Sequence, residues 1–396
     1  MGEFSRIVRV IFAGAITVGL LVLGSSPASG LPAGKDGEEE KPPTISGPGH
    51  QLVYPILAWS KIFPGKLQGV AVAKTSGAVA AITESKLYYF KDDPTAAWTA
   101  GDNQNQDWKH LQDLYLNADG SRVFFQSDLK PRVHTETMEL TLHLFDGAGR
   151  ELWAKPNLYR YQSAMMSPTG KYIIIGELFH GGIKVHDDNL NLLWEKNVQF
   201  WYIAYDPLER YLFDGEGGIL YTVKGEQVWD FGGFTRILSV SDNAEYVMTQ
   251  YYRTVQSSSR MFLMGRLALK KVELAGTGGC VSPDGSLAAY VNADQKLVVY
   301  RTLELLEAGP ANLPPLYHTG FIKPKTIQIS RDNRSLLAVG QESVVNSAIL
   351  LVNLDKMKTA FKKPIDADIQ AALATEDNRL LVIKAGTNAI MAFNLY

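Results

Sequence analysis

The residue types that most often carry catalysis or hold metals are sparse in this chain of 396 residues. Seven histidines and one cysteine are present, and no histidine pair has the H-x-x-x-H or H-E-x-x-H spacing of a zinc site. His180 and His186 flank one predicted strand on the same side, where a structural role is the simpler interpretation. No G-x-S-x-G, P-loop or paired-carboxylate signature stands in a convincing context. The sequence therefore predicts no catalytic residues, no metal site and no cofactor.

The single thiol, Cys280, lies in Gly278-Gly-Cys-Val281 within an apolar stretch. A cysteine in such a position usually acts as a small buried hydrophobic residue, so we expect a buried and unreactive thiol. One cysteine excludes an internal disulfide, and the stability of the fold must come from packing.

The sequence gives a stronger indication of a binding function, because aromatic and basic side chains occur together in the longer predicted connections between strands. Aromatic rings and guanidinium groups carry much of the binding energy at protein interfaces. For any single aromatic residue of this group, packing inside the fold or plugging its central channel is a comparable alternative. The candidate binding residues are Trp108, Tyr159, Arg160, Tyr161, Trp201, Tyr202, Phe234, Arg236, Tyr252, Arg253 and His318.

A repeated unit must position these residues. The sequence SPTGKYIIIG at 167–176 returns as SPDGSLAAYV at 282–291 and, more loosely, as SRDNRSLLAV at 330–339. The shared pattern is an apolar strand, a turn rich in Asn, Asp, Gly or Pro, and a second strand. Its spacing of about 35 to 50 residues is the period of a propeller blade. Eight stretches fit the pattern: 70–83, 114–126, 164–176, 202–215, 237–250, 279–291, 327–340 and 371–384.

Each unit continues with a third strand and, after another turn, a fourth that often ends in tryptophan. Asp146-Gly-Ala-Gly-Arg-Glu-Leu-Trp153 and Asp188-Asn-Leu-Asn-Leu-Leu-Trp194 show this fourth strand. Four short strands per unit without helical periodicity predict antiparallel four-stranded blades. Because the tryptophan recurs once in each of units one to four instead of clustering, we expect it to pack between blades.

The two ends of the chain predict how the ring closes. The eighth unit stops after its third strand, whereas residues 57–63, before the first unit, resemble the fourth-strand sequence at 193–198. Pairing of residues 57–63 with 389–395 would complete the last blade and remove an exposed sheet edge. The predicted fold is therefore all-β: an eight-bladed β-propeller of four-stranded antiparallel blades, closed by an N-terminal strand in the last blade.

Over residues 52–396 the chain resembles the eight-bladed propellers of the pyrroloquinoline-quinone-type (PQQ-type) repeat superfamily, with WD40-like turns in its later blades. The Asp-x-x-Gly-x-x-Leu-Trp-like sequences of units two to four carry the resemblance, and units six to eight lack the terminal tryptophan. The resemblance implies an alternative function, that of a PQQ quinoprotein dehydrogenase. Another propeller enzyme, such as a lyase or a glycosidase, is a further alternative, because its site need not leave a linear motif. Quinoprotein alcohol dehydrogenases of that superfamily typically place an adjacent cysteine pair over the cofactor, which a single cysteine cannot form.

In a propeller, the turns joining strands A–B and C–D of each blade lie on one face, and the B–C and D–A connections lie on the other. Here the A–B and C–D turns are short, whereas several B–C and D–A connections are long and contain the candidate binding residues. Long connections on a rigid scaffold are where binding residues concentrate, so we expect the binding face there.

The N-terminus and the composition bear on location and partners. Residues 1–30, with Arg6, Arg9 and an uncharged run from Ile11 to Gly24, resemble a signal peptide or an uncleaved anchor, and residues 31–50 resemble a flexible linker before the propeller at 51–396. A net charge of −2 argues against nucleic acid.

These observations predict an exported, non-catalytic binding module in the periplasm or outside the cell. The expected partner is an envelope protein, a peptide or a carbohydrate, and the expected membrane contact is only through an uncleaved anchor.

Overall fold

The computed structural model describes residues 55–101, 109–128, 140–157, 162–177, 182–197, 203–206, 208–214, 218–232, 235–251, 260–321, 323–341 and 346–395. The predicted signal peptide and linker lie outside these residues. The described residues all belong to one compact body of the chain, Gln51–Tyr396. Within the part of the chain that is described, no helix has the length and apolar character needed to span a membrane.

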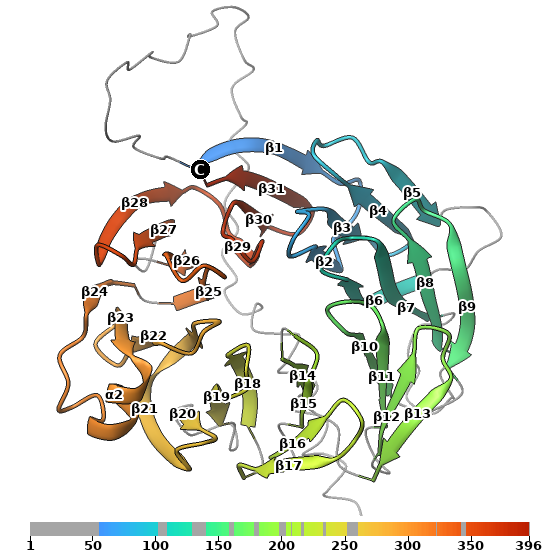
Figure 1. Ribbon diagram of the computed structural model, residues 1–396. Helices are drawn as coiled ribbons and strands as arrows, with labels where there is room; N and C mark the ends of the chain where they lie inside the picture. The colour runs from blue at the N-terminus through green and yellow to red at the C-terminus, as the bar shows by residue number, and fades with distance from the viewer. Residues whose placement is uncertain are drawn as a thin grey trace, which may run out of the picture. The chain divides into compact units, whose positions relative to one another are not determined.

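The strands of the described residues form six antiparallel sheets of four strands and one of seven. Figure 1 shows how these sheets follow one another. The seven-stranded sheet is held together by β21 (Lys270–Val281), whose first half pairs with β20 and whose second half pairs with β22. The sheet is therefore two four-stranded units that share one strand. With this division, the described strands fall into units 1 to 8, and a count of eight blades stays a prediction of the repeat.

Units 1 to 4 follow one another along the chain. Their strands are β2 (Gly69–Val72), β3 (Val79–Ile82), β4 (Lys86–Phe90) and β5 (Trp98–Gly101) in unit 1, and β6 (Lys109–Leu116), β7 (Arg122–Asp128), β8 (Leu140–Asp146) and β9 (Glu151–Asn157) in unit 2. Unit 3 contains β10 (Gln162–Met166), β11 (Tyr172–Glu177), β12 (Gly182–Asp187) and β13 (Leu192–Lys196). Unit 4 contains β14 (Ile203–Tyr205), β15 (Tyr211–Asp214), β16 (Ile219–Thr222) and β17 (Gln227–Asp230).

Units 5 to 8 complete the ring. Unit 5 contains β18 (Thr235–Val240), β19 (Tyr246–Tyr251), β20 (Arg260–Gly265) and the first half of β21. Unit 6 contains the second half of β21, β22 (Leu287–Asn292), β23 (Lys296–Arg301) and β24 (Tyr317–Gly320), with a short helix α2 (Thr302–Ala308) before β24. The strands of unit 7 are β25 (Lys323–Ile329), β26 (Ser335–Gln341), β27 (Ser347–Asn353) and β28 (Lys358–Ile365). Those of unit 8 are β29 (Ile369–Ala374), β30 (Leu380–Ala385), β31 (Ala389–Asn394) and β1 (Ile56–Ile62).

Eight hydrophobic clusters hold the units together, and each one is made by two consecutive units. The cluster between units 6 and 7, for example, joins Val299 of β23 to Leu336 of β26. The cluster between units 8 and 1 joins Ile390 of β31 to Phe90 of β4. Each sheet therefore buries both faces against its neighbours, which agrees with the almost continuous apolar sequences of its middle strands.

The predicted closure of the ring is confirmed. Strand β1 pairs antiparallel with β31, from Ile56 opposite Asn394 to Ile62 opposite Ala389. Trp59 on β1 is buried, and its ring lies 5.6 Å from the ring of Phe90 in unit 1. The prediction of an all-β propeller of antiparallel four-stranded blades, closed by an N-terminal strand, is confirmed.

Tryptophans at the outer strands fasten neighbouring units, as the repeat predicts. Trp98 donates its indole N–H to the carbonyl of Gly147 at 3.1 Å, Trp153 to that of Asp188 at 2.8 Å and Trp194 to that of Val223 at 2.7 Å. Each acceptor lies in the C–D turn of the following unit. A buried indole usually finds such a partner, so the repeated position combines packing with a directed hydrogen bond.

The glycine of the C–D turn lies directly beneath the indole. Gly225 has φ +84°, and a Cβ atom added there would lie 2.8 Å from the Trp194 ring. The position therefore requires glycine for two reasons, the left-handed backbone conformation and the close approach of the ring.

We expect Gly225→Ala to lower the free energy of unfolding by about 2 kcal/mol, because overpacking adds to the backbone strain. Gly232→Ala is the matched control, since its φ is +85° and nothing lies within 4 Å of the added Cβ. Chemical denaturation of both variants separates the two contributions. Equal losses in the two variants would show that the indole contact contributes nothing.

Candidate functional site

In the described part of the chain, hydrogen bonds link the A–B turns of consecutive units everywhere except between units 6 and 7, and we call this set of turns the turn ring. The amide of Thr75 in unit 1 donates to the carbonyl of Ala118 in unit 2 at 2.8 Å, and the amide of Ala118 donates to Pro168 in unit 3 at 2.5 Å. On the other side of the ring, Arg331 of unit 7 donates to Glu376 of unit 8 at 2.7 Å. Glu376 in turn donates to Lys74 of unit 1 at 2.9 Å.

Proline interrupts this series because it has no amide hydrogen to donate. After Pro168 in unit 3, side chains replace the missing link: the hydroxyl of Thr169 donates to the carboxylate of Glu209 in unit 4 at 2.6 Å. From unit 4 the guanidinium of Arg210 donates to the carbonyl of Asp242 in unit 5. Asp242 then donates its own amide to Pro283 of unit 6 at 2.7 Å.

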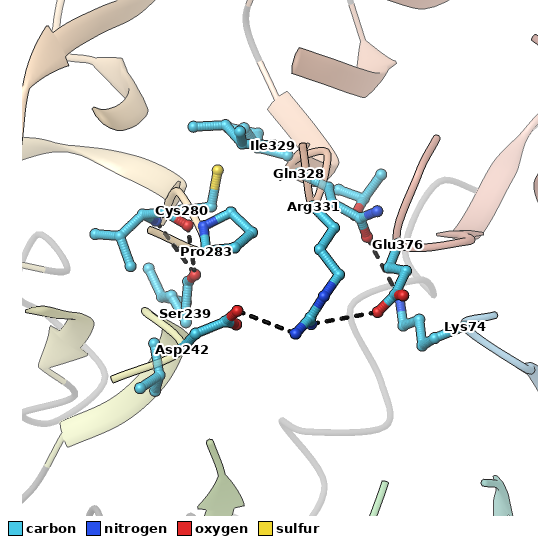
Figure 2. A pocket seen from close by; sticks show the side chains of 14 residues that line it. Lys74, Ser239, Asp242, Cys280, Pro283, Gln328, Ile329, Arg331 and Glu376 are labelled. Atoms are coloured by element: carbon cyan, nitrogen blue, oxygen red, sulfur yellow. Dashed lines mark hydrogen bonds and ion pairs between the residues drawn. The ribbon is translucent and has the colours of Figure 1, made fainter. Parts of the chain in front are cut away.

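The second described proline of the turn ring, Pro283, lies beside a pocket. Pro283 has no amide hydrogen and cannot donate a hydrogen bond to the turn of unit 7. A cavity of about 320 Å³ lies at this point, between the ends of β18, β21 and β25 (Figure 2). Leu238, which lines the cavity, is the extra residue of a β-bulge between Ile237 and Ser239. A bulge redirects a side chain, so the apolar wall depends on this local irregularity.

The pocket combines apolar walls with a charged rim. Its walls are the last residues of the three inner strands, and its rim comes from the turn ring and from unit 1. The apolar lining residues are Leu238, Val240, Cys280, Val281, Ile327 and Ile329, and the charged ones are Lys74, Asp242, Arg331 and Glu376.

Arg331 joins two carboxylates across the rim. Its Nη2 lies 3.1 Å from Oδ2 of Asp242, and its Nη1 lies 3.4 Å from Oε2 of Glu376. Asp242 belongs to unit 5 and Arg331 to unit 7, so the first pair reaches past unit 6. All three side chains are partly exposed, between 24% and 37%, and such pairs each contribute at most about 1 kcal/mol. Their effect is to fix positions at the rim.

Lys74 closes the other side of the rim. Its Nζ donates to the carbonyl of Ala374 at 2.9 Å and to Oε1 of Gln328 at 3.4 Å. Gln328 is itself held by hydrogen bonds to the carbonyl of Thr375 at 2.6 Å and to Oδ1 of Asn378 at 3.0 Å. Although Lys74 reaches solvent, the dense surrounding protein lowers the pKa of its ammonium, and nearby Glu376 opposes this shift.

The prediction for Cys280 is confirmed as far as its burial is concerned. The residue is only 5% exposed and lines the pocket wall. Burial raises the pKa of its thiol to about 12, so the reactive thiolate is scarce at neutral pH.

We expect Cys280 to resist a thiol reagent such as DTNB in the folded protein at pH 8 and to react completely in concentrated urea. Absorbance at the product's maximum measures both reactions. Reaction in the folded state as fast as in urea would contradict the burial and the pKa shift of the thiol.

Two of the eleven predicted binding residues lie in the described part of the chain. Arg236 is exposed near the start of β18, at the end of this strand opposite the turn ring. His318 is exposed on β24, the outermost strand of unit 6. The structure thus does not bring these two together, since one is on an inner strand and the other on an outer strand. The other nine lie outside the described residues and stay predictions: Trp108, Tyr159, Arg160, Tyr161, Trp201, Tyr202, Phe234, Tyr252 and Arg253.

Sequence reasoning missed a second group of chemically capable residues, in unit 2. The Oγ of Ser127 lies 2.7 Å from Nε2 of His143, whose Nδ1 lies 2.9 Å from Oε1 of Glu151. The three residues come from β7, β8 and β9, and their spacing in the sequence matches no recognisable motif. Ser127 is 1% exposed and His143 4%, and the ring of His143 stacks on Phe125 at 4.7 Å. This burial gives a substrate no access to the serine, and the array is structural.

Burial lowers the pKa of His143, against the opposing effect of the Glu151 carboxylate. The folded state therefore binds its proton less readily than the unfolded state, whose histidine pKa is about 6.5. A depressed histidine pKa makes a contribution to stability that is present above this value and is lost as pH falls through the folded pKa.

We expect the thermal midpoint of the wild type to fall between pH 7.5 and pH 5, and that of His143→Gln to fall less. His318→Gln is the control, because this side chain is exposed on an outer strand. An unchanged pH dependence in His143→Gln would show that its protonation is not linked to unfolding.

Comparison with known proteins identifies the class of fold. No family model matches the chain, and no curated protein sequence matches it. Among solved structures, 1306 chains are similar. One is the Dos1 propeller, with a TM-score of 0.58 and 10% identity over 87% of this chain and 96% of that one. Another is a eukaryotic initiation factor, with a TM-score of 0.56 and 10% identity over 85% of this chain and 87% of that one. At this identity the likeness shows the fold alone, a β-propeller.

Proposed function

We propose that this propeller is a non-catalytic interaction module that binds a polypeptide segment in the pocket beside Pro283. The observation that carries the proposal is the pocket itself: apolar walls beneath a rim of fixed charged groups, built on rigid strands. Small concave sites with a few convergent polar groups are the usual form of a binding site.

The strands around the pocket support a polypeptide as its ligand. Both β18 and β25 stand at an end of their sheet, and each pairs with one neighbour only among the described strands. A strand of this kind presents backbone N–H and C=O groups on its other edge, and an extended chain can pair with such an edge. The pocket thus offers main-chain hydrogen bonding next to space for side chains.

Location and a second contact surface belong to the same proposal. The pattern of Arg6, Arg9 and the apolar run after them supports export to the cell envelope, periplasmic or extracellular. The long B–C and D–A connections, with their aromatic and basic residues, would add a surface on the opposite face, for an envelope protein, a peptide or a carbohydrate.

We further propose that the eight units are blades of the PQQ-type or WD40-like kind, supported by the tryptophan contacts of Trp98, Trp153 and Trp194. No observation on the described residues favours the quinoprotein alternative.

A photo-crosslinking amino acid placed at Thr326, on the pocket wall, tests the proposed site. After incubation with an extract of the producing cells, we expect a discrete crosslinked protein that excess unlabelled wild type suppresses. The same amino acid at Leu193, exposed on outer strand β13, is the control and should give no such product.

Excess Arg331→Ala protein should suppress the product less well than the wild type, because the rim is no longer fixed. No product at Thr326, or the same product at both positions, would exclude the pocket as a binding site.

A further inference from the structure

The inner strand β25 directs some of its backbone groups away from its own sheet. Hydrogen-bonded and non-hydrogen-bonded pairs alternate along an antiparallel ladder. The amide of Ser330 donates to the carbonyl of Ser335 at 2.8 Å, so these two residues form a hydrogen-bonded pair. The register between β25 and β26 then makes Ile329 and Ile327 the non-hydrogen-bonded positions. Their N–H and C=O groups therefore point away from β26, and both residues line the pocket.

In the two neighbouring units, side chains bind the backbone groups that point outward in this way. In unit 6, the hydroxyl of Ser239 donates to the carbonyl of Val281 at 3.3 Å and accepts the amide of Val281 at 3.2 Å (Figure 2). In unit 8, the ammonium of Lys74 donates to the carbonyl of Ala374 at 2.9 Å. Val281 and Ala374 correspond to Ile329, because each directly precedes the turn of its unit. The outward groups of these inner strands are therefore accessible to hydrogen-bonding partners from outside their own sheet.

The backbone of Ile327 has no such partner. No side chain of the described residues bonds to its N–H or C=O group, and no described strand pairs with this edge of β25. An extended segment that runs antiparallel to β25 would place one residue opposite Ile327 and exchange two backbone hydrogen bonds with it. The edge of β25 at the pocket thus provides a pairing position for a ligand.

The ligand residue opposite Ile327 would direct its side chain into the pocket. Directly opposite residues of two paired strands carry their side chains on the same face of the sheet. Ile327 packs against the hydrophobic cluster between units 6 and 7, so this face of β25 is the one turned toward unit 6. Cys280 and Val281 of unit 6 line the pocket there, and Leu238 lines it from unit 5. The incoming side chain would therefore contact apolar walls.

The charges of the rim favour an uncharged ligand. The carboxylates of Asp242 and Glu376 balance the cations of Arg331 and Lys74, and the guanidinium lies 3.1 and 3.4 Å from the two carboxylates. A charged side chain that left water for this pocket would find no excess of the opposite charge, and its desolvation would cost free energy. An apolar side chain has no such cost and gains free energy in proportion to the apolar area that it buries.

We infer that the pocket binds an aliphatic side chain of about the size of leucine, carried by an extended segment that pairs antiparallel with β25 at Ile327. This inference rests on the proposed function and specifies both the residue that enters the pocket and the strand that binds its backbone. The side chain packs on Leu238 and Cys280. The backbone N–H and C=O of the same ligand residue exchange hydrogen bonds with Ile327.

Fluorescein-labelled heptapeptides Gly-Ser-Thr-X-Thr-Ser-Gly test the inference, with X as leucine, alanine, lysine or N-methyl-leucine. N-methyl-leucine keeps the side chain of leucine and removes the amide hydrogen that would pair with Ile327. By fluorescence anisotropy we expect the leucine peptide to bind at least tenfold more tightly than each of the others, a difference of about 1.4 kcal/mol. Any of the other three peptides binding as tightly as the leucine peptide, or no binding of the leucine peptide, would overturn the inference.

Leu238→Asn places a polar amide on the pocket wall and should reduce the affinity for the leucine peptide to that for the alanine peptide. Leu193→Asn is the matched control, because Leu193 is exposed on outer strand β13 and lies outside the pocket lining. We expect this control to bind like the wild type. Unchanged affinity in a folded Leu238→Asn protein would contradict the inference.

A measurement on the chain with Leu238 unaltered covers the case in which Leu238→Asn does not fold. The unlabelled leucine peptide should suppress crosslinking at Thr326 at concentrations where the N-methyl-leucine peptide does not. A crosslink that neither peptide suppresses would overturn the aliphatic, strand-paired ligand and leave the proposed pocket standing. The absence of any crosslink would instead remove the proposed function.

Discussion

The packing of each sheet against its two neighbours is the constraint on which the rest of the structure depends. Among the described residues, no unit has a core of its own, because each of the eight hydrophobic clusters is shared by two units. Such an arrangement is complete only when the first and last units meet, which is the role of the pairing between β1 and β31. Trp59 joins this pairing to unit 1 through Phe90. The pairing of β1 with β31 therefore stabilises the whole ring.

The ring also explains how a pocket forms in a fold made of similar units. In the turn ring, a backbone amide of one turn donates a hydrogen bond to a carbonyl of the turn in a neighbouring unit. Proline interrupts this series because it has no amide hydrogen. At Pro168 the Thr169–Glu209 contact restores the connection. At Pro283 the connection is instead made by Arg331, which reaches past unit 6 to Asp242. The space left beneath this longer bridge is the pocket, so a small departure from the repeat generates the candidate site.

Much of the fold could be predicted because its determinants recur along the chain. The turn sequences such as Ser282-Pro-Asp-Gly285 marked the units, and the terminal Trp194 marked a contact between them. The candidate site could not be predicted in this way. Lys74, Asp242, Arg331 and Glu376 lie in short turns that look the same as the others, and they are up to 302 residues apart in sequence (376 − 74). The Ser127–His143–Glu151 array was missed for a different reason: its residues lie on three successive strands and meet only when β7, β8 and β9 pair.

The sequence by itself determined the repeat, the strand content of each unit, the tryptophan contacts and the closure by the N-terminal strand. Each of these depends on local residue pattern: alternation of apolar strands with turns, and one recurring aromatic position. Only the tertiary structure decided which turns face one another across the ring, where the series of hydrogen bonds is bridged by a side chain, and which charged side chains meet at the rim of the pocket. Those properties depend on distances between residues of different units. The repeated pattern is similar in every unit, so it does not predict which of the residues that differ between units lie close together in the folded ring.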